Sequence, residues 1–211
     1  MKNIVILISG SGTNLRSIYN NILNGKINAT ISLVIANKKC PGITFATEKK
    51  IPNIIISHLD YNSRVAYDKG LICEIEKYTP NYVVLAGFMR VLSPVFVRHF
   101  KNKLINIHPS LLPKYKGLNT HKRVIESSDK YHGSTVHLVD EEVDGGKPIA
   151  YIKLEIKDCD SAISLEKRIK LEENKLYPKV LELLASDKII IDDGDICFDG
   201  YTIKKPLHLK F

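Results

Sequence analysis

The sequence predicts an α/β protein with a doubly wound, mostly parallel sheet and an antiparallel C-terminal extension. In the first half, short apolar runs alternate with helix-type patterns at regular spacing, which is typical of strands linked by crossover helices. These apolar runs contain few polar residues, as expected of strands that are buried on both faces. In the second half, polar and apolar residues alternate, and the last residues read as short strands separated by turns.

The first strand is expected over Asn3–Ile8, a continuous apolar run. The turn Ser9–Asn14 follows it, and a helix is expected over Leu15–Leu23 because Leu15 and Ile18 recur on one side. Up to the middle of the chain we then expect, in order, a strand at Thr30–Ala36, a helix at Ile43–Lys50, a strand at Asn53–Ser57, a helix at Ser63–Tyr78, a strand at Tyr82–Ala86, a helix at Val95–Phe100 and a strand at Leu104–His108.

The second half is expected to begin with two strands joined by an acidic loop. The strands are Gly133–Val139 and Ile149–Ile156, and the loop is Asp140–Gly146. A long helix over Ser161–Leu184 should follow. Pro178 should bend or split this helix, because proline removes a backbone donor.

The long helix should be capped by Asp160 or Ser161, and short strands should follow it. The tail Lys188–Phe211 contains Asp-Asp-Gly and Asp-Gly sequences, which favour tight turns between such strands. We expect a single domain over residues 1–211, since this length is usual for one domain and no repeat or low-complexity linker divides the chain.

Composition narrows the class of protein. A hydrophobic share of 44% suits a globular core, and no apolar run approaches the roughly 20 residues that span a bilayer. The start Met1–Ile4 leads directly into a core strand, unlike a secretory signal. The four cysteines form no C-x-x-C pair, so we expect reduced thiols in a cytoplasmic protein. They are Cys40, Cys73, Cys159 and Cys197.

The net charge of +8 does not indicate nucleic acid. The lysines are spread along the whole chain, with no basic stripe on a predicted helix and no basic tail. Small anionic substrates, or simply a lysine-rich surface, account for the charge equally well. We therefore expect small-molecule partners, and neither nucleic acid nor a membrane.

The run Leu104–Tyr115 carries the clearest chemical signal. Side chains two apart on a strand share a face, so Asn106 and His108 should lie together at the end of the strand. An amide donor and an imidazole suit the stabilisation of an oxyanion and the transfer of a proton. Pro109 and Pro113 stiffen the loop and restrict His108. The alternative interpretation is a loop cap beside an ordinary hydrogen-bonding histidine.

Two further loops are candidates for the same site. Gly10–Thr13 lies between a strand and a helix, where backbone amides and the helix dipole attract anions. It completes neither a P-loop nor G-x-G-x-x-G, so a phosphate monoester site and a plain tight turn both stay open. Asp144 precedes two glycines in the acidic loop. It is either a solvated acid or the carboxylate that orients His108 and keeps it protonated.

The other titratable residues indicate no site by themselves. His121, His132 and His137 match no usual zinc spacing, so we assign them to hydrogen bonding or packing and expect no metal. Arg64 and Glu173 lie on predicted helices, where a solvated surface charge is the default expectation.

Six segments together carry a family resemblance: Ile8–Asn14, Ser63–Asp68, Val83–Pro94, Asn106–Tyr115, His132–Gly133 and Val143–Gly146. With them the chain resembles, over essentially its whole length, the folate-dependent glycinamide ribonucleotide formyltransferases, members of the formyltransferase superfamily. The motif Asn-x-His-Pro-Ser-Leu-Leu-Pro is specific for formyl transfer with folate but does not choose the acceptor. The resemblance implies a Rossmann-like fold with a nucleotide-binding half at residues 1–108 and a folate-binding and C-terminal half at 109–211.

The same resemblance implies the reaction and its residues. The formyl group of 10-formyltetrahydrofolate, a co-substrate, would pass to the amine of N1-(5-phosphoribosyl)glycinamide without a metal. The implied catalytic residues are Asn106, His108 and Asp144. The implied ribonucleotide contacts are Gly12, Thr13, Asn14, Lys170, Leu171, Glu172 and Glu173. The implied folate contacts are Arg64, Met89, Arg90, Val91, Leu92, Asn106, Asp140, Glu141, Glu142, Val143 and Asp144.

The chain departs from this family at a few positions. Lys116, Asn119 and Lys147 stand where Pro, His and Pro are common, and Lys170 and Leu171 replace smaller or polar residues. None of these changes removes an implied catalytic group.

Three other activities compete with this interpretation. A methionyl-tRNA formyltransferase would be expected to carry a further basic domain, and a formyltetrahydrofolate hydrolase a regulatory domain before the first strand. The phosphate-type turn favours a small phosphorylated acceptor instead. A non-catalytic nucleotide-binding module would leave Asn106, His108 and Asp144 without a role.

Overall fold

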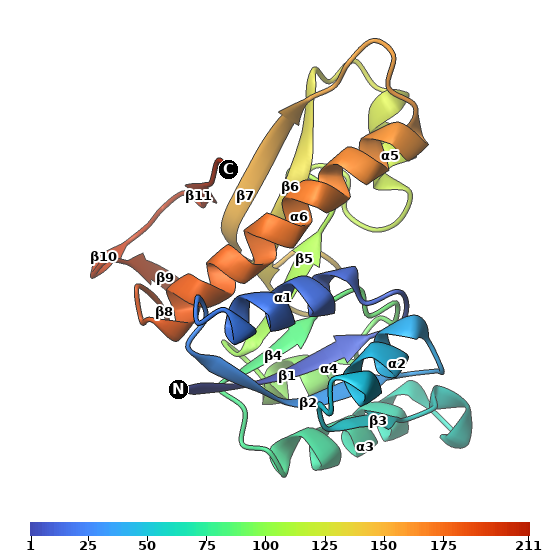
Figure 1. Cartoon of the computed structure of the whole chain (residues 1–211). Coiled ribbons are helices and arrows are strands. Elements are labelled where there is room, and N and C mark those ends of the chain that lie inside the picture. The colour runs from blue at the N-terminus through green and yellow to red at the C-terminus, as the bar shows by residue number, and fades with distance from the viewer.

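The computed structural model describes residues 1–211, which form one large sheet with helices on both faces (Figure 1). The strands of this sheet are β1 (Lys2–Ile8), β2 (Ala29–Ala36), β3 (Asn53–Ile55), β4 (Tyr82–Leu85), β5 (Leu104–His108), β6 (Tyr131–Leu138), β7 (Pro148–Glu155) and β11 (Leu207–His208). The helices are α1 (Thr13–Leu23), α2 (Pro41–Glu48), α3 (Arg64–Glu76), α4 (Pro94–His99), α5 (Thr120–Ile125) and α6 (Ala162–Ala185), with a short 3-10 turn at His58–Asp60.

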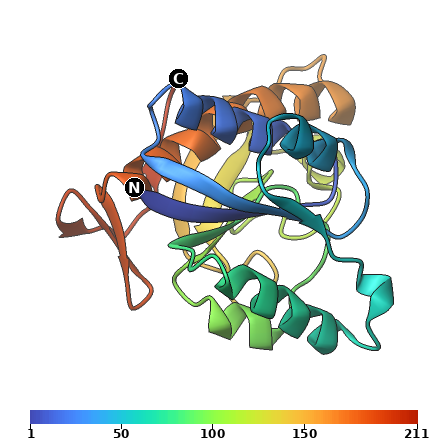
Figure 2. The same ribbon diagram turned by 60° about the horizontal axis from the view of Figure 1, so that its bottom comes forward.

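The sheet confirms the predicted doubly wound topology. Its strand order is β11-β7-β6-β5-β4-β1-β2-β3, and the five strands from β3 to β5 are parallel. β6 runs antiparallel to both of its neighbours. Figure 2 shows α1 and α6 on one side of the sheet and α3 and α4 on the other. The central strands are therefore buried on both faces, which explains why β1 is almost wholly apolar.

The C-terminal extension is also as predicted, with one addition. The strands β8 (Ile189–Asp192), β9 (Asp195–Phe198) and β10 (Tyr201–Thr202) form a small antiparallel sheet. The last strand, β11, instead pairs in parallel with β7 at the edge of the large sheet. No helix combines the length and the apolar character needed to cross a bilayer.

Pro178 is expected to bend or split the long helix, and the second of these alternatives is wrong because the helix is not split. α6 continues through Pro178, which is buried inside it. Proline leaves the carbonyl four residues earlier without its helical donor. That carbonyl belongs to Asn174, and it accepts a hydrogen bond from the Ser17 hydroxyl on α1. A neighbouring helix thus satisfies the exposed backbone group. Ser161 caps the start of α6 in a capping box with Ser164, as one of the two predicted caps.

Two short helical elements escaped prediction. α5 and the 3-10 turn lie in segments that read as loops, because six and three residues are too few to show a helical period. The other elements begin and end within a few residues of the expected positions. α1 and α2, for example, each start two residues early, at Thr13 and Pro41.

Candidate active site

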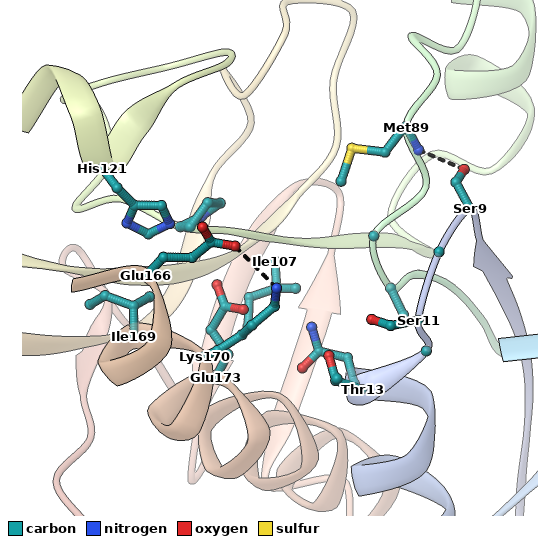
Figure 3. A pocket seen from close by; sticks show the side chains of 16 residues that line it. Ser9, Ser11, Thr13, Met89, Ile107, His121, Glu166, Ile169, Lys170 and Glu173 are labelled. Atoms are coloured by element: carbon teal, nitrogen blue, oxygen red, sulfur yellow. Dashed lines mark hydrogen bonds and ion pairs between the residues drawn. The ribbon is translucent and has the colours of Figure 1, made fainter. Parts of the chain in front are cut away.

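A pocket of about 250 Å³ opens at the carboxyl ends of β1, β4 and β5 (Figure 3). The strand order reverses between β1 and β4, and this is where doubly wound sheets bind their ligands. The pocket is lined by Ser9, Gly10, Ser11, Gly12, Thr13, Asn14, Ala86, Gly87, Met89, Ile107, Pro109, His121, Glu166, Ile169, Lys170 and Glu173. The predicted ribonucleotide contacts on the glycine turn, and Lys170 and Glu173 on α6, thus lie around one cavity.

The loop after β1 presents free backbone amides to this cavity. Gly12 precedes α1 with a left-handed φ of 71°, and no side chain caps the helix. A Cβ on Gly12 would come within 2.8 Å of the Gly42 Cα, so only glycine fits. The Gly42 amide in turn donates to the Gly10 carbonyl at 3.1 Å. The uncapped amides at the start of α1, together with the positive end of the helix dipole, make this wall suitable for an anion.

The expectation that Glu173 is a solvated surface charge is wrong, because Glu173 lies on the buried side of α6 that forms a wall of the pocket. This residue is only 7% exposed. Its carboxyl accepts a hydrogen bond from the Ser134 hydroxyl at 2.9 Å. Burial raises the pKa of Glu173 to about 7. A charge pattern along one helix does not reveal this burial, since it depends on β6 and α1 packing against that helix.

Asn106, His108 and Asp144 do come together, beside the pocket rather than inside it. Ile107 lines the cavity, whereas the flanking Asn106 and His108 occupy the opposite face of β5. The distance from His108 Nδ1 to Asp144 Oδ2 is 3.2 Å, and both side chains are largely buried. The Gly117 amide also donates to Asp144 Oδ2, at 2.9 Å. Asp144 is therefore not the solvated acid of the alternative interpretation.

Both ring nitrogens of His108 face oxygen acceptors. Nε2 lies 2.9 Å from the Tyr115 carbonyl oxygen, and Nδ1 lies near the Asp144 carboxylate. Neither acceptor can donate a proton, unless the carboxyl is itself protonated. A protonated imidazole would satisfy both contacts at once, whereas a neutral ring satisfies one. Tyr115 contributes this contact through its backbone, with a left-handed φ of 57°.

The orientation of Asn106 follows from the histidine opposite it on β6. His137 Nδ1 lies 2.6 Å from the Leu138 carbonyl oxygen, so Nδ1 carries the proton and Nε2 accepts. The Asn106 amide nitrogen is 3.2 Å from His137 Nε2 and therefore donates to it. Burial lowers the pKa of His137, in agreement with a neutral ring. The second N–H of the Asn106 amide does not take part in this contact.

His121, His132 and His137 do not form a shared cluster. His132 Nε2 contacts His121 Nδ1 at 3.1 Å, while His137 bonds to Asn106 and Leu138 on the other side of β6. The assignment of these histidines to hydrogen bonding is confirmed. No group of three or more His, Cys, Asp or Glu residues is arranged to hold a metal ion.

The predicted folate contacts lie mainly on exposed loops. Met89, on the pocket rim, is 72% exposed, and Val91 is 55% exposed in the same loop. Arg90 lies over the Tyr67 ring at 5.2 Å, and Leu92 packs partly against the core. Arg64 is exposed at the start of α3.

The acidic loop is held by ion pairs from both sides. Glu141 pairs with Arg98 on α4 at 2.6 Å, and Glu142 pairs with Lys116 at 2.8 Å. The other residues of the loop, Asp140 and Val143, are exposed. On α6, two predicted ribonucleotide contacts lie outside the pocket lining: Leu171 is 64% exposed, and Glu172 pairs with Lys175.

Sequence reasoning missed four residues at this site. Tyr115, His137, His121 and Glu166 are all in contact with the pocket or with the Asn106–His108 pair. Tyr115 acts through its backbone, which no side-chain pattern reveals. His137 carried a usable signal, because β5 and β6 were both predicted, and antiparallel pairing places it opposite Asn106.

A doubly wound sheet with an anion-type loop at its switch point, and an amide, an imidazole and a carboxylate gathered next to it, is the arrangement of an α/β enzyme that binds an anionic substrate. The chain belongs to the formyl transferase family, whose model matches residues 2–181. This confirms the resemblance seen in the sequence.

Individual relatives agree with this assignment. The chain is 42% identical to the phosphoribosylglycinamide formyltransferase of Escherichia coli over 95% of both proteins. It is 38% identical to the human trifunctional purine biosynthetic protein adenosine-3, matching 92% of this chain and 20% of that protein. Its structure matches the phosphoribosylglycinamide formyltransferase of Coxiella burnetii with a TM-score of 0.94, 38% identity and 99% of each chain covered.

Proposed function

We propose that this protein transfers the formyl group of 10-formyltetrahydrofolate to the amine of N1-(5-phosphoribosyl)glycinamide, giving formylglycinamide ribonucleotide in purine (IMP) biosynthesis. One observation carries the proposal. The anion-type pocket and the Asn106–His108–Asp144 group lie on opposite faces of the same end of β5, so an acceptor held in the pocket would reach the polar group by extending past the tip of that strand. Membership of the formyl transferase family supports the same reaction.

The ribonucleotide would occupy the pocket. The backbone amides around Gly12, Thr13 and Asn14 would hold its phosphate, assisted by the dipole of α1. Lys170 would add a positive charge, and the buried Glu173 carboxyl would accept a hydrogen bond from a ribose hydroxyl. In this arrangement Leu171 and Glu172, which lie outside the pocket lining, would be at the edge of the bound ligand. The amine would then point toward the end of β5.

The chemical step needs an oxyanion partner and a route for one proton. Attack of the amine on the formyl carbon forms a C–N bond and places negative charge on the formyl oxygen. The free N–H of Asn106 and a protonated His108 would stabilise that oxygen. Asp144 would hold His108 in place and in its charged form. As the bond to the folate N10 breaks, the proton lost by the amine is transferred to that nitrogen.

The folate would lie along the exposed loops on the far side of β5. Val91 offers apolar surface there, Val143 in the acidic loop is 48% exposed, and Met89 adds apolar surface from the rim of the pocket. Exposed apolar side chains gathered in neighbouring loops suit a flat aromatic ligand. Arg64, Arg90 and Leu92, with the loop residues Asp140, Glu141, Glu142 and Asp144, complete the proposed contacts.

Several broader expectations belong to this proposal. The chain would work as one domain, with a nucleotide-binding half at 1–108 and a folate-binding half at 109–211, although α6 of the second half also forms a wall of the pocket. Both substrates are small molecules, and the formyl folate is a co-substrate. We place the reaction in the cytoplasm, which is supported by the free thiols of all four cysteines.

The proposal is tested by mixing the protein with 10-formyltetrahydrofolate and the ribonucleotide and following folate deformylation and formylated product. We expect deformylation to require the ribonucleotide and to match product formation one to one. Deformylation without the ribonucleotide would indicate a hydrolase. Formylation of charged methionyl-tRNA in place of the ribonucleotide would indicate the tRNA enzyme, and ligand binding without turnover a binding module.

A further inference from the structure

The side chains of the pocket do not make it positively charged. Its lining includes two carboxyl groups, Glu166 and Glu173, and only one lysine or arginine, Lys170. A site for a phosphate dianion is expected to have an excess of positive charge or of amide donors. Here the amides of the loop after β1 supply the donors, and the opposite wall holds a balanced pair of charges.

Lys170 already has a partner in the pocket. Its Nζ lies 3.1 Å from Glu166 Oε1, one turn earlier on α6 (Figure 3). Glu followed by Lys four residues later is the favourable order for such a pair on a helix. The two side chains are about half exposed, at 49% for Glu166 and 47% for Lys170, so the pair can separate without unfolding anything.

No other group in the pocket replaces Lys170 as a cation. His121 is the remaining basic residue of the lining, and it is half-buried against His132. Burial lowers the pKa of His121, which keeps the ring neutral near pH 7. Glu173 is neutral or negative at every pH. An anion entering the pocket therefore depends on Lys170 for positive side-chain charge.

From this arrangement we propose that Glu166 is a competing counter-ion: a phosphate group binds Lys170 only by displacing the Glu166 carboxylate. The inference rests on the proposed function, since it takes the phosphate of the ribonucleotide as the incoming anion. Displacing Glu166 costs the same for any phosphate. A free phosphate would have only the loop amides and Lys170 to offset that cost, whereas a ribosyl phosphate would also contact Glu173, which lines the same pocket. Glu166 thus weakens the binding of both ligands by the same factor, and the preference for a phosphorylated sugar over inorganic phosphate would come from Glu173.

The same geometry would also allow Glu166 to assist phosphate binding, and its removal would then change the affinity in the opposite direction. Glu166 could hold Lys170 extended toward the phosphate, in which case its removal would weaken binding. Competition predicts that removal strengthens binding. Titration calorimetry on the full chain distinguishes the two, with the ribonucleotide and inorganic phosphate as separate ligands.

The variants are Glu166→Gln, Lys170→Gln and the double variant. We expect Glu166→Gln to lower the Kd of both ligands about two- to fivefold, as for loss of a half-exposed ion pair. In the Lys170→Gln background the same change should have almost no effect. Glu182→Gln is the matched control, because it removes a similar pair with Lys179 at 2.6 Å on the same helix, away from the pocket.

Weaker binding by Glu166→Gln would overturn the inference, and so would an equal gain in the Lys170→Gln background, which would indicate simple repulsion of anions. Failure of the proposed function looks different. In that case wild-type protein would not bind the ribonucleotide, while the inorganic phosphate titrations would still report on Glu166. Glutamine is a good helix former, so circular dichroism should show all variants folded.

Discussion

The two sides of β5 differ in how completely the protein satisfies its own polar groups. On one side, His108 and Asp144 are only 7% and 11% exposed, and each contacts a further backbone group. On the other side, Glu166 and Lys170 are about half exposed, and their charged groups pair with each other. The groups proposed to act on the reacting atoms are thus fixed before any ligand arrives, whereas those proposed to seat the phosphate can rearrange around it.

Replacing His108 tests this difference most strongly. His108→Ala should lower kcat by about a thousandfold, because a positioned acid–base group typically contributes two to four orders of magnitude. The Kd of the ribonucleotide should stay within about twofold, since His108 faces away from the pocket. Steady-state kinetics and calorimetry measure the two quantities. Equal losses in turnover and affinity would mean that the two sides of β5 do not have separate roles.

Asp144→Asn should have the next largest effect. The change keeps the size of the side chain and its left-handed backbone but removes the charge beside His108, so kcat should fall about a hundredfold and its pH dependence should change. Asp199→Asn is a matched control, since Asp199 also has a left-handed φ, in a turn far from the site. An unaltered rate and pH profile would remove Asp144 from the mechanism.

Glu173 provides a prediction on stability and pH. Its pKa is raised to about 7 in the folded protein from an ordinary value of 4.5, so ionisation disfavours the folded state. Its contribution to stability is intact below pH 4.5, declines between pH 4.5 and 7, and is constant above pH 7. Glu173→Gln should therefore gain stability relative to wild type as the pH rises, by up to about 3 kcal/mol. Urea unfolding at pH 4.5 and 8 measures this, and a difference independent of pH would argue against the burial effect.

Gly12→Ala sharpens the contrast at the phosphate loop. Alanine at this position would have to adopt a left-handed φ, and its Cβ would lie 2.8 Å from the Gly42 Cα. We therefore expect the free energy of unfolding to fall by about 2 kcal/mol and ribonucleotide binding to weaken. Gly25→Ala separates the two causes. Gly25 has nearly the same φ, 70°, but no neighbour within 4 Å of the added Cβ, so it should lose only the conformational part. Equal losses in both variants, by chemical denaturation, would show that the contact with Gly42 is unimportant.

The parts of this protein that sequence reasoning predicts are those encoded in neighbouring residues. The apolar runs of β1, β4 and β5 predict buried parallel strands, and their order places Asn106 at a ligand-binding edge. The features that sequence reasoning misses depend on contacts between residues far apart in the chain. The burial of Glu173 needs Ser134 on β6, and the meeting of Asp144 with His108 needs a loop that folds back from the next strand pair. The continuity of α6 through Pro178 depends on a hydroxyl more than 150 residues earlier in the chain.

The bond from Ser17 to the Asn174 carbonyl has a consequence for what the pocket accepts. Ser17 lies one turn beyond Asn14 on α1, and Asn174 is adjacent to Glu173 on α6, so the bond ties together the two walls of the cavity. This hydrogen bond joins a side chain of one wall to a backbone oxygen of the other, so it contributes to the spacing between them. A ligand that pushed the two walls apart would therefore have to break this hydrogen bond.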